Sequence, residues 1–277
     1  MQASPFAWTA PGGVLGRIVA ESRERVRAIP AARRSELERA TPSADTRPGF
    51  AAALRAGATV QVVAEVKRRS PSKGEIKAAL SAGAQARAYA AGGAAAISIL
   101  TEPNHFGGSL EDLSEARSSV AVPLLRKDFV VDRTQLFETR AAGGNAVLLI
   151  ARALEPSALA QLAAEALALG IEPLIEVRSE GELARALETA APAIGVNQRD
   201  LETLEVDAAV MIRLLPLIPS DRVAIAESGV RARADVERAA ACGADAVLVG
   251  SMLSGAADPA ARLRELTGVA REGRRGR

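Results

Sequence analysis

Eight short runs of aliphatic and β-branched residues, which begin at residue 60, constrain the fold of this chain more than any other feature. The runs recur at intervals of about 20 to 35 residues, and each is followed by an Ala-, Leu-, Glu- and Arg-rich stretch with helical periodicity. We therefore predict strands over residues 60–66, 96–100, 122–126, 146–150, 173–177, 193–197, 223–227 and 246–250.

This alternation predicts an α/β protein, and eight repeats are the number that closes a (β/α)8 TIM barrel. A chain of 277 residues is long enough to form one such domain. An open doubly wound sheet is the alternative fold. Its dinucleotide-binding form is disfavoured because no G-x-G-x-x-G motif follows the first run.

The predicted barrel occupies residues 59–268 and is flanked by two shorter segments. Residues 1–58 carry apolar side chains at helical spacing and predict a helical N-terminal extension too small to be a domain. Residues 269–277 end in the sequence REGRRGR, which we expect to be a disordered basic tail.

The composition excludes several classes of site and partner. A single cysteine, Cys242, and a single histidine, His105, exclude a disulfide framework and a Cys/His zinc cluster. No signal peptide or long apolar run is present, so we expect a cytoplasmic protein without a membrane partner. The pI is near 9.0, but the net charge is only +2 and the densest basic cluster lacks aromatic neighbours, so we expect no nucleic-acid partner.

Polar residues at the ends of the predicted strands are the strongest sign of chemistry, because barrel enzymes place their active sites there. In the first run, Val63, Glu65 and Lys67 share one face, so Glu65 and Lys67 would stand at the mouth if Val63 fills the interior. Other runs end with further polar candidates, which are Lys127, Glu176, Asn197 and Glu227.

Each of these side chains alone has a structural interpretation. Glu65 could simply pair with Lys67, and Glu227 could cap the following helix. The set is harder to explain in this way, because several carboxylates and ammonium groups at one rim are costly to desolvate unless they act on a ligand.

Lysine is rare in this chain, with four Lys against 31 Arg. Arginine keeps its proton in proteins, whereas the pKa of a lysine can be lowered until it acts as a general acid. Lys67 and Lys127 are therefore candidate proton donors, while Lys73 and Lys77 are expected in a solvated loop and a helix start.

Two small-residue turns follow the last two strands and indicate a phosphorylated, anionic small-molecule ligand. Ser228 and Gly229 follow the seventh run, and Gly250 and Ser251 end the eighth. Backbone N–H groups in such turns bind anions, and this is the usual phosphate position in the fold.

The motifs AEVKRRSPSKG, LTEPNHFGGSLEDL, LLRKDFVV, AVLLI, PLIEV, IGVNQRDLETLEVD, AESGV and VLVGSML resemble, in order, those of indole-3-glycerol phosphate synthases. The resemblance implies cofactor-free and metal-free closure of 1-(2-carboxyphenylamino)-1-deoxyribulose 5-phosphate to indole-3-glycerol phosphate, with loss of carbon dioxide and water. It implies that Lys127 is the general acid and Glu176 the base. Lys67 would meet the substrate carboxylate and could share the acid role.

The same resemblance assigns the remaining site residues. Glu65, Asn197 and Glu227 would orient the catalytic groups and the substrate hydroxyls. The residues expected to contact the substrate or to wall its aromatic ring are Ser70, Arg199, Phe106, Phe129 and Leu148, beside the phosphate turns. His105 is interpreted as a loop residue.

Two positions depart from the pattern of the family. Gln198 follows Asn197 where Asn or Ser is usual, and Asn145 replaces a common Asp. The alternative functions are a phosphoribosylanthranilate isomerase-like enzyme, which would use a Cys and an Asp at the rim, and a non-catalytic phosphosugar-binding barrel. Association with other enzymes of the tryptophan pathway and the oligomeric state stay open.

Overall fold

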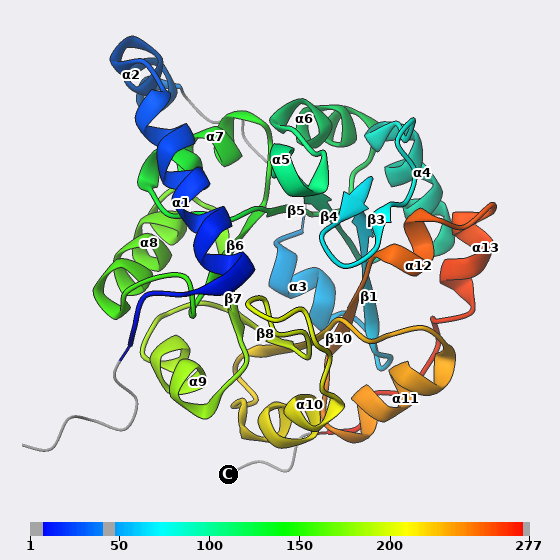
Figure 1. The fold of residues 1–277 in the computed structure, drawn as a ribbon. Coiled ribbons are helices and arrows are strands. Elements are labelled where there is room, and N and C mark those ends of the chain that lie inside the picture. Colours follow the sequence, from blue (N-terminus) through cyan, green and yellow to red (C-terminus); the bar gives the residue numbers. More distant parts are fainter. Residues whose placement is uncertain (1–7, 41–47, 274–277) are drawn as a thin grey trace, which may run out of the picture.

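The computed structural model describes residues 8–40 and 48–273, and its centre is a closed parallel barrel (Figure 1). Neighbouring strands follow the order β1-β10-β9-β8-β7-β6-β5-β4, and every pair is parallel. The barrel strands are β1 (Gln61–Val66), β4 (Ala96–Leu100), β5 (Leu124–Lys127), β6 (Ala146–Ile150), β7 (Glu172–Val177), β8 (Ala193–Asn197), β9 (Val223–Glu227) and β10 (Ala246–Val249).

The predicted (β/α)8 barrel is therefore confirmed, and most predicted strands differ from the observed ones by one residue at most. The predicted strand 122–126 is wrong at both ends, since β5 runs from Leu124 to Lys127. Pro123 has no N–H to donate to a neighbouring strand, so regular pairing begins after it. Lys127 is consequently the last residue of β5, and the strand pairing fixes the position of its backbone.

Helices surround the barrel, and their starts follow the sequence signals for capping. Ser81, Ser109, Asp132 and Ser179 each accept a backbone N–H with their side chain at a helix start. The helices are α1 (Gly13–Ala28), α2 (Ala31–Arg39), α3 (Phe50–Arg55), α4 (Ala82–Gly92), α5 (Pro103–Phe106), α6 (Leu110–Ser119), α7 (Arg133–Ala141), α8 (Pro156–Ala168), α9 (Glu180–Leu187), α10 (Ala208–Leu214) with the 3₁₀ turn η1 (Leu215–Leu217), α11 (Arg233–Ala241), α12 (Ser251–Ser254) and α13 (Pro259–Arg264).

Alternation along the strands produces two apolar cores. One face of each strand packs against the helices, and the other face fills the barrel, as Val63 does in β1. Helix α3 lies behind the barrel centre in Figure 1 and inserts Phe50 and Leu54, both fully buried, into the inner core. At the start of α3, the N–H of Ala51 donates to Glu172 Oε2 at 2.7 Å, where β7 begins. Helix α3 therefore closes the face opposite to the strand ends.

Helices α1 and α2 precede α3 in the chain, and α1 lies over the rim of the barrel near β6 (Figure 1). Its apolar face, which includes Leu15, Ile18 and Val19, joins the inner core. The predicted extension is thus helical where it is described, and its helices take part in the core of the barrel.

The chain beyond α13 differs from the expected disordered tail over its first residues. Val60 N–H donates to Val269 O at 2.8 Å, and Arg271 N–H donates to Ala58 O at 2.8 Å. Val269 is buried because its side chain covers apolar surface beside the start of β1. The last residues of the expected tail, 274–277, lie outside the described residues.

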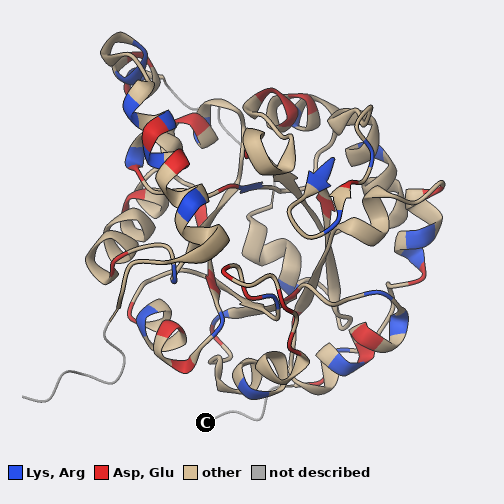
Figure 2. Ribbon diagram, in the orientation of Figure 1, with Lys and Arg blue, Asp and Glu red and all other residues tan. Residues whose placement is uncertain are grey.

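A short antiparallel hairpin, β2 (Arg69–Ser70) with β3 (Gly74–Glu75), follows β1 at the mouth. Acidic and basic residues are interspersed over the outer helices (Figure 2). No helix among the described residues is both long enough and apolar enough to span a bilayer.

Candidate active site

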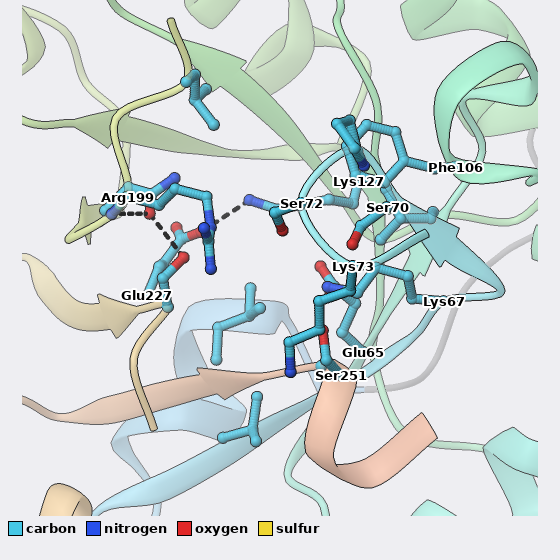
Figure 3. Close-up of a pocket in the computed structure, with 18 of the residues that line it drawn as sticks. Glu65, Lys67, Ser70, Ser72, Lys73, Phe106, Lys127, Arg199, Glu227 and Ser251 are labelled. Atoms are coloured by element: carbon cyan, nitrogen blue, oxygen red, sulfur yellow. Dashed lines mark hydrogen bonds and ion pairs between the residues drawn. The ribbon is translucent and has the colours of Figure 1, made fainter. Parts of the chain in front are cut away.

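A cavity of about 450 Å³ opens at the carboxyl ends of the barrel strands (Figure 3). Every residue that the sequence nominated for the site lines it. The polar members of this set are Glu65, Lys67, Ser70, Lys127, Glu176, Asn197, Arg199, Glu227, Ser228 and Ser251, and the others are Phe106, Phe129, Leu148, Gly229 and Gly250.

Lys127 stands between two carboxylates from strands across the barrel mouth. Its Nζ lies 2.8 Å from Glu176 Oε2 and 2.7 Å from Glu227 Oε2. The Lys127 side chain is 13% exposed, and those of Glu176 and Glu227 are 4% and 2% exposed. We call these three residues the Lys127 triad.

The charge state of Lys127 differs from the expectation of a lowered pKa. Burial opposes the ammonium form, but the facing carboxylates of Glu176 and Glu227 outweigh it and raise the pKa of Lys127 above its usual value. Lys127 is therefore a stably protonated donor before a ligand binds. A substrate that takes the place of the carboxylates would weaken this stabilisation of the charge.

The two carboxylates of the triad have opposite pKa shifts. Burial raises the pKa of Glu176, but the charge of Lys127 and a hydrogen bond from Asn197 outweigh it and hold the pKa below the usual value. Burial and the neighbouring Glu176 raise the pKa of Glu227 to about 8, in spite of Lys127. One ammonium therefore balances one ionised carboxylate, and Glu227 holds a proton near neutral pH.

Asn197 orients Glu176 from the end of β8. Its Nδ2 donates to Glu176 Oε1 at 3.0 Å, and its Oδ1 accepts from the Ser228 hydroxyl at 2.8 Å and from Arg199 N–H at 2.9 Å. The amide of Asn197 is thereby fixed with its donor toward the carboxylate. Arg199 itself points its Nη1 to Leu204 O at 2.7 Å, beside the cavity.

Glu65 and Lys67 form a separate ion pair at the end of β1, with Lys67 Nζ 2.5 Å from Glu65 Oε2. The structural interpretation of this pair is therefore correct as a contact. The cap interpretation of Glu227 is wrong, since its Oε2 accepts from Lys127 and its Oε1 has no hydrogen-bond partner among the described residues. The pair can form in this position only because residue 250 is a glycine without a side chain. A Cβ at Gly250 would lie 2.1 Å from Glu65 Oε2 and 2.8 Å from Lys67 Nζ.

The backbone of Glu65 is held by two buried hydroxyl groups. Ser254 Oγ donates to Glu65 O at 2.8 Å, and Tyr89 Oη donates to the same oxygen at 3.1 Å. Ser254 Oγ also accepts from Lys67 N–H at 3.2 Å. No sequence motif nominated Tyr89 or Ser254, because their partner is a main-chain atom far away in the sequence.

The turn after β9, which was predicted to bind phosphate, has an unusual backbone conformation. The backbone φ angles of Ser228 and Gly229 are 64° and 81°, in the left-handed region that residues other than glycine rarely adopt. Gln198 Nε2 donates to Ser228 O at 2.7 Å. The unusual Gln198 thus supports this turn directly.

The apolar wall of the cavity is formed by Phe106, Phe129 and Leu148. The ring centroids of Phe106 and Phe129 are 6.1 Å apart with a 35° angle between the planes. Phe129 and Leu148 are 7% and 2% exposed. Beside Phe106, the buried Ser70 hydroxyl has no hydrogen-bond partner among the described residues (Figure 3).

Some lining residues were not nominated from the sequence. Lys73 is exposed in the loop, as expected, and from the tip of the β2–β3 hairpin it also lines the cavity (Figure 3). Val14 and Ile18 enter from α1, and Arg231 enters from the loop after β9. The helical spacing of apolar residues in 1–58 predicted a helix here, but it could not show that the helix reaches the mouth of the barrel.

Three residues that the sequence singled out without assigning them to the site lie outside the cavity lining. His105 is on α5, with Nε2 2.8 Å from Glu21 Oε2. Cys242 directly follows α11 and is half-buried. Asn145 accepts Leu124 N–H at 3.0 Å and Arg117 Nη1 at 3.2 Å, so its amide oxygen can serve as an Asp oxygen would.

One group of possible metal ligands is found among the described residues, namely Glu21, Glu102 and His105. The oxygens of Glu102 already accept three backbone N–H groups of α5 and a bond from Arg25. This engagement makes the group a poor metal site, and it lies outside the cavity lining.

Comparison of the whole chain with known proteins identifies its family. The sequence model of indole-3-glycerol phosphate synthase matches residues 15–266. The chain belongs to the indole-3-glycerol phosphate synthase family. Relatives that carry the family name include proteins of Nocardioides sp., 48% identical over 85% of this chain and 89% of the relative, and of Kineococcus radiotolerans, 53% identical over 75% and 76%. A third, from Mycobacterium avium, is 46% identical over 93% of this chain and 94% of its own length.

Solved structures with low sequence identity support the fold that this family assignment implies. The N-acetylmannosamine-6-phosphate 2-epimerase of Clostridium perfringens matches 76% of this chain and 93% of its own with a TM-score of 0.59 and 15% identity. A thiamine phosphate pyrophosphorylase from Pyrococcus furiosus matches 75% and 93% with a TM-score of 0.56 and 15% identity. At this identity, both matches concern the barrel alone.

Proposed function

We propose that this chain catalyses the closure of 1-(2-carboxyphenylamino)-1-deoxyribulose 5-phosphate to indole-3-glycerol phosphate in tryptophan biosynthesis. The observation that carries the proposal is the Lys127 triad, a buried ammonium shared by two carboxylates in the cavity. Family membership supports the same reaction.

The reaction needs more proton donation than proton removal. The carbon that bears the substrate carboxylate attacks the ketone, whose oxygen takes a proton, and carbon dioxide leaves to restore the aromatic ring. The resulting hydroxyl leaves as water after a second protonation, and one proton is removed as the indole double bond forms. Lys127 is the donor to the carbonyl oxygen and then to the leaving hydroxyl.

Glu176 is the proposed base for the last proton. Its pKa is held below the usual value and Asn197 fixes its orientation, so it is ionised and aimed when the ligand enters. Glu227, with a pKa near 8, is a proposed proton store next to Lys127 that can reload the ammonium between the two donations.

The remaining parts of the cavity match the other parts of this substrate. Lys67, in contact with Glu65, would meet the substrate carboxylate, and Phe106, Phe129 and Leu148 would enclose the aryl ring. The phosphate would lie at the turns around Gly229 and Gly250, where backbone N–H groups bind anions. Ser70, Arg199, Ser228 and Ser251 are proposed further contacts to the substrate.

The isomerase alternative finds less support in the cavity. It would need a reactive Cys at the rim, and Cys242 is not among the lining residues. An Asp, Asp128, is present, but Arg126 Nη2 binds it at 2.9 Å. A non-catalytic phosphosugar-binding barrel would not explain why ionisable groups with opposite pKa shifts face the cavity.

Turnover of the proposed substrate by the purified chain is the deciding experiment. The fluorescence of the indole product should rise in proportion to enzyme, and the Lys127→Ala variant should serve as the blank for contaminating host activity. Conversion of phosphoribosyl anthranilate instead would favour the isomerase, and binding of either compound without conversion would favour the non-catalytic barrel.

Three further parts of the proposal need their own tests. Turnover should survive dialysis against a chelator, because no step is assigned to a metal or cofactor. A cytoplasmic location follows from the proposed biosynthetic role and can be checked by cell fractionation. Docking to other enzymes of tryptophan biosynthesis is proposed only as an association to be tested by co-purification.

A further inference from the structure

Helix α1 contacts both elements that carry the aromatic wall of the cavity. Ser22 and Arg25 lie one turn apart on α1, and Ser22 is completely buried. Ser22 Oγ donates to Phe129 O at 2.6 Å, and Gln135 Nε2 donates to the same carbonyl at 3.2 Å. The backbone of Phe129 is thus tied to α1 from one side.

Arg25 joins the two loops through their carboxylates. Its Nη1 donates to Glu102 Oε1 at 3.0 Å, and its Nη2 donates to Asp128 Oδ1 at 3.2 Å. The side chains of Glu102 and Asp128 are 0% and 2% exposed, whereas that of Arg25 is 29% exposed. A single guanidinium therefore bridges two buried carboxylates that precede the two phenylalanines.

Each bridged carboxylate in turn holds the backbone of one phenylalanine. Glu102 Oε2 accepts the N–H groups of His105 at 2.6 Å and Phe106 at 3.1 Å. Asp128 Oδ1 accepts the N–H of Phe129 at 2.8 Å, on the same oxygen that receives Arg25. A continuous series of short contacts thus runs from Phe106 through Arg25 to Phe129.

We infer that Arg25 is a positioning residue that sets the spacing of Phe106 and Phe129, and thereby the affinity of the site for the aryl half of its substrate. The inference rests on the proposed function, in which the aryl ring lies against these side chains. Arg25 is not among the residues that line the cavity, so it acts through its partners, chiefly Glu102 and Asp128, with a longer contact of 3.5 Å to Ser22 Oγ.

The fold should survive the loss of Arg25, because both carboxylates keep other partners. Glu102 retains three backbone N–H groups of α5. Asp128 retains Arg126 at 2.9 Å and the Thr101 hydroxyl at 2.8 Å. What is lost is the guanidinium bridge between Glu102 and Asp128, while the Thr101–Asp128 hydrogen bond still joins the two loops.

The test compares two probes that occupy different ends of the cavity. One is the alcohol made by reduction of the substrate ketone, which keeps the aryl ring but cannot cyclise, and the other is inorganic phosphate. Arg25→Met should weaken calorimetric binding of the reduced analogue about tenfold, the upper range for a well-placed aromatic contact. Phosphate affinity should stay unchanged, and KM should rise more than kcat falls.

Two variants serve as matched comparisons. Arg25→Lys keeps the charge but has one compact ammonium for two carboxylates. Its affinity for the reduced analogue should therefore lie between those of the wild type and Arg25→Met. Arg23→Met removes an exposed arginine from the same helix and should bind both probes normally. Circular dichroism and the melting temperature show whether each variant is folded.

Several outcomes would overturn the inference. Normal binding of the analogue by a folded Arg25→Met or Arg25→Lys variant would show that the bridge does not set the wall. Equal weakening of both probes would show a general structural role. If the wild type binds the analogue normally but does not turn over the substrate, the proposed function fails while the binding comparison still decides the role of Arg25.

Discussion

The Lys127 triad and the Glu65–Lys67 pair both place a lysine at the mouth of the barrel, but the balance of charge around each lysine differs. Lys67, which directly follows β1, faces one carboxylate, that of Glu65 two residues earlier in the chain. Lys127 faces two carboxylates, which come from β7 and β9. With both carboxylates ionised, the triad would carry one net negative charge in a buried site, whereas the Glu65–Lys67 pair has one carboxylate for one ammonium.

This difference decides where proton transfer is favoured. The excess charge of the triad is relieved when one carboxylate takes up a proton, and the pKa of Glu227 is accordingly raised. A neutral pair has no such reason to exchange protons. We therefore assign proton transfer to the triad and binding of an anionic group to Lys67, and the following predictions test that division from the largest expected effect to the smallest.

Lys127→Arg should abolish most turnover although the charge is retained. The guanidinium does not give up its proton and is too large to sit between Glu176 and Glu227 as the ammonium does. We expect kcat to fall by about 10³ to 10⁴, the upper part of the range for general acid catalysis. Single-turnover measurement of indole fluorescence would give the chemical step directly.

Lys77→Arg provides the control for this exchange, because Lys77 is exposed and is not a lining residue. It should behave as the wild type. Near-normal kcat in Lys127→Arg would contradict the acid role and would move proton donation to Lys67.

Glu176→Gln should lower kcat by about 10² to 10³ and change KM little, since the amide keeps the shape but accepts no proton. Glu180→Gln, an exposed acid at the start of α9, is the matched control. If KM rose while kcat stayed normal, Glu176 would be a binding residue, and the triad would lose its proposed base.

The sequence was sufficient to predict the barrel and the positions of the triad members at its mouth. The eight repeats imply a closed barrel, and alternation along a strand places the side chain of Glu176 inward without knowledge of its neighbours. The strand ends also predicted that Lys127 and Glu227 face the same space.

The partners of these residues could not be predicted from the sequence alone. Lys127 and Glu227 are 100 residues apart in the chain, and which lysine meets which carboxylate depends on the register of the barrel. The turn at Gly250 was expected to bind phosphate through its backbone, but the sequence did not show that a Cβ at this position would meet Glu65 and Lys67. The contacts of Arg25 on α1 could not be predicted either, because α1 lies outside the βα repeat and the sequence does not show where this helix packs.

Gly250→Ala should disrupt the Glu65–Lys67 pair without a change in either charged residue. The new Cβ would clash with Glu65 Oε2, so the pair must separate or β10 must shift. We expect substrate affinity to fall by about tenfold to a hundredfold, in line with a lost charge-assisted hydrogen bond of about 1.5 to 3 kcal/mol. Calorimetry with the reduced analogue would measure this loss.

The controls for Gly250→Ala lie on the same turn and helix. At Gly255 a Cβ would meet Ser251 O at 3.4 Å, so Gly255→Ala should be tolerated. Ser251→Ala removes at most one hydroxyl contact and should lose less affinity than Gly250→Ala. The reverse order would mean that the Ser251 side chain, and not the space at Gly250, matters for binding.

The smallest predicted effect concerns the pH dependence of stability. The pKa of Glu227 is raised to about 8 in the folded state from a usual value of 4.5, so the folded protein holds a proton that the unfolded chain releases between these values. Stability from this group is complete below about pH 4.5 and is lost as the pH rises toward 8. Glu227→Gln remains neutral throughout, so the melting temperature of the wild type should fall from pH 5 to pH 8 by about 5 °C more than that of the variant. Exposed Glu237→Gln is the control, and it should follow the wild type at both pH values. Equal pH dependence in the wild type and in Glu227→Gln would mean that Glu227 is ionised at neutral pH, and the charge difference between the triad and the pair would no longer explain their roles.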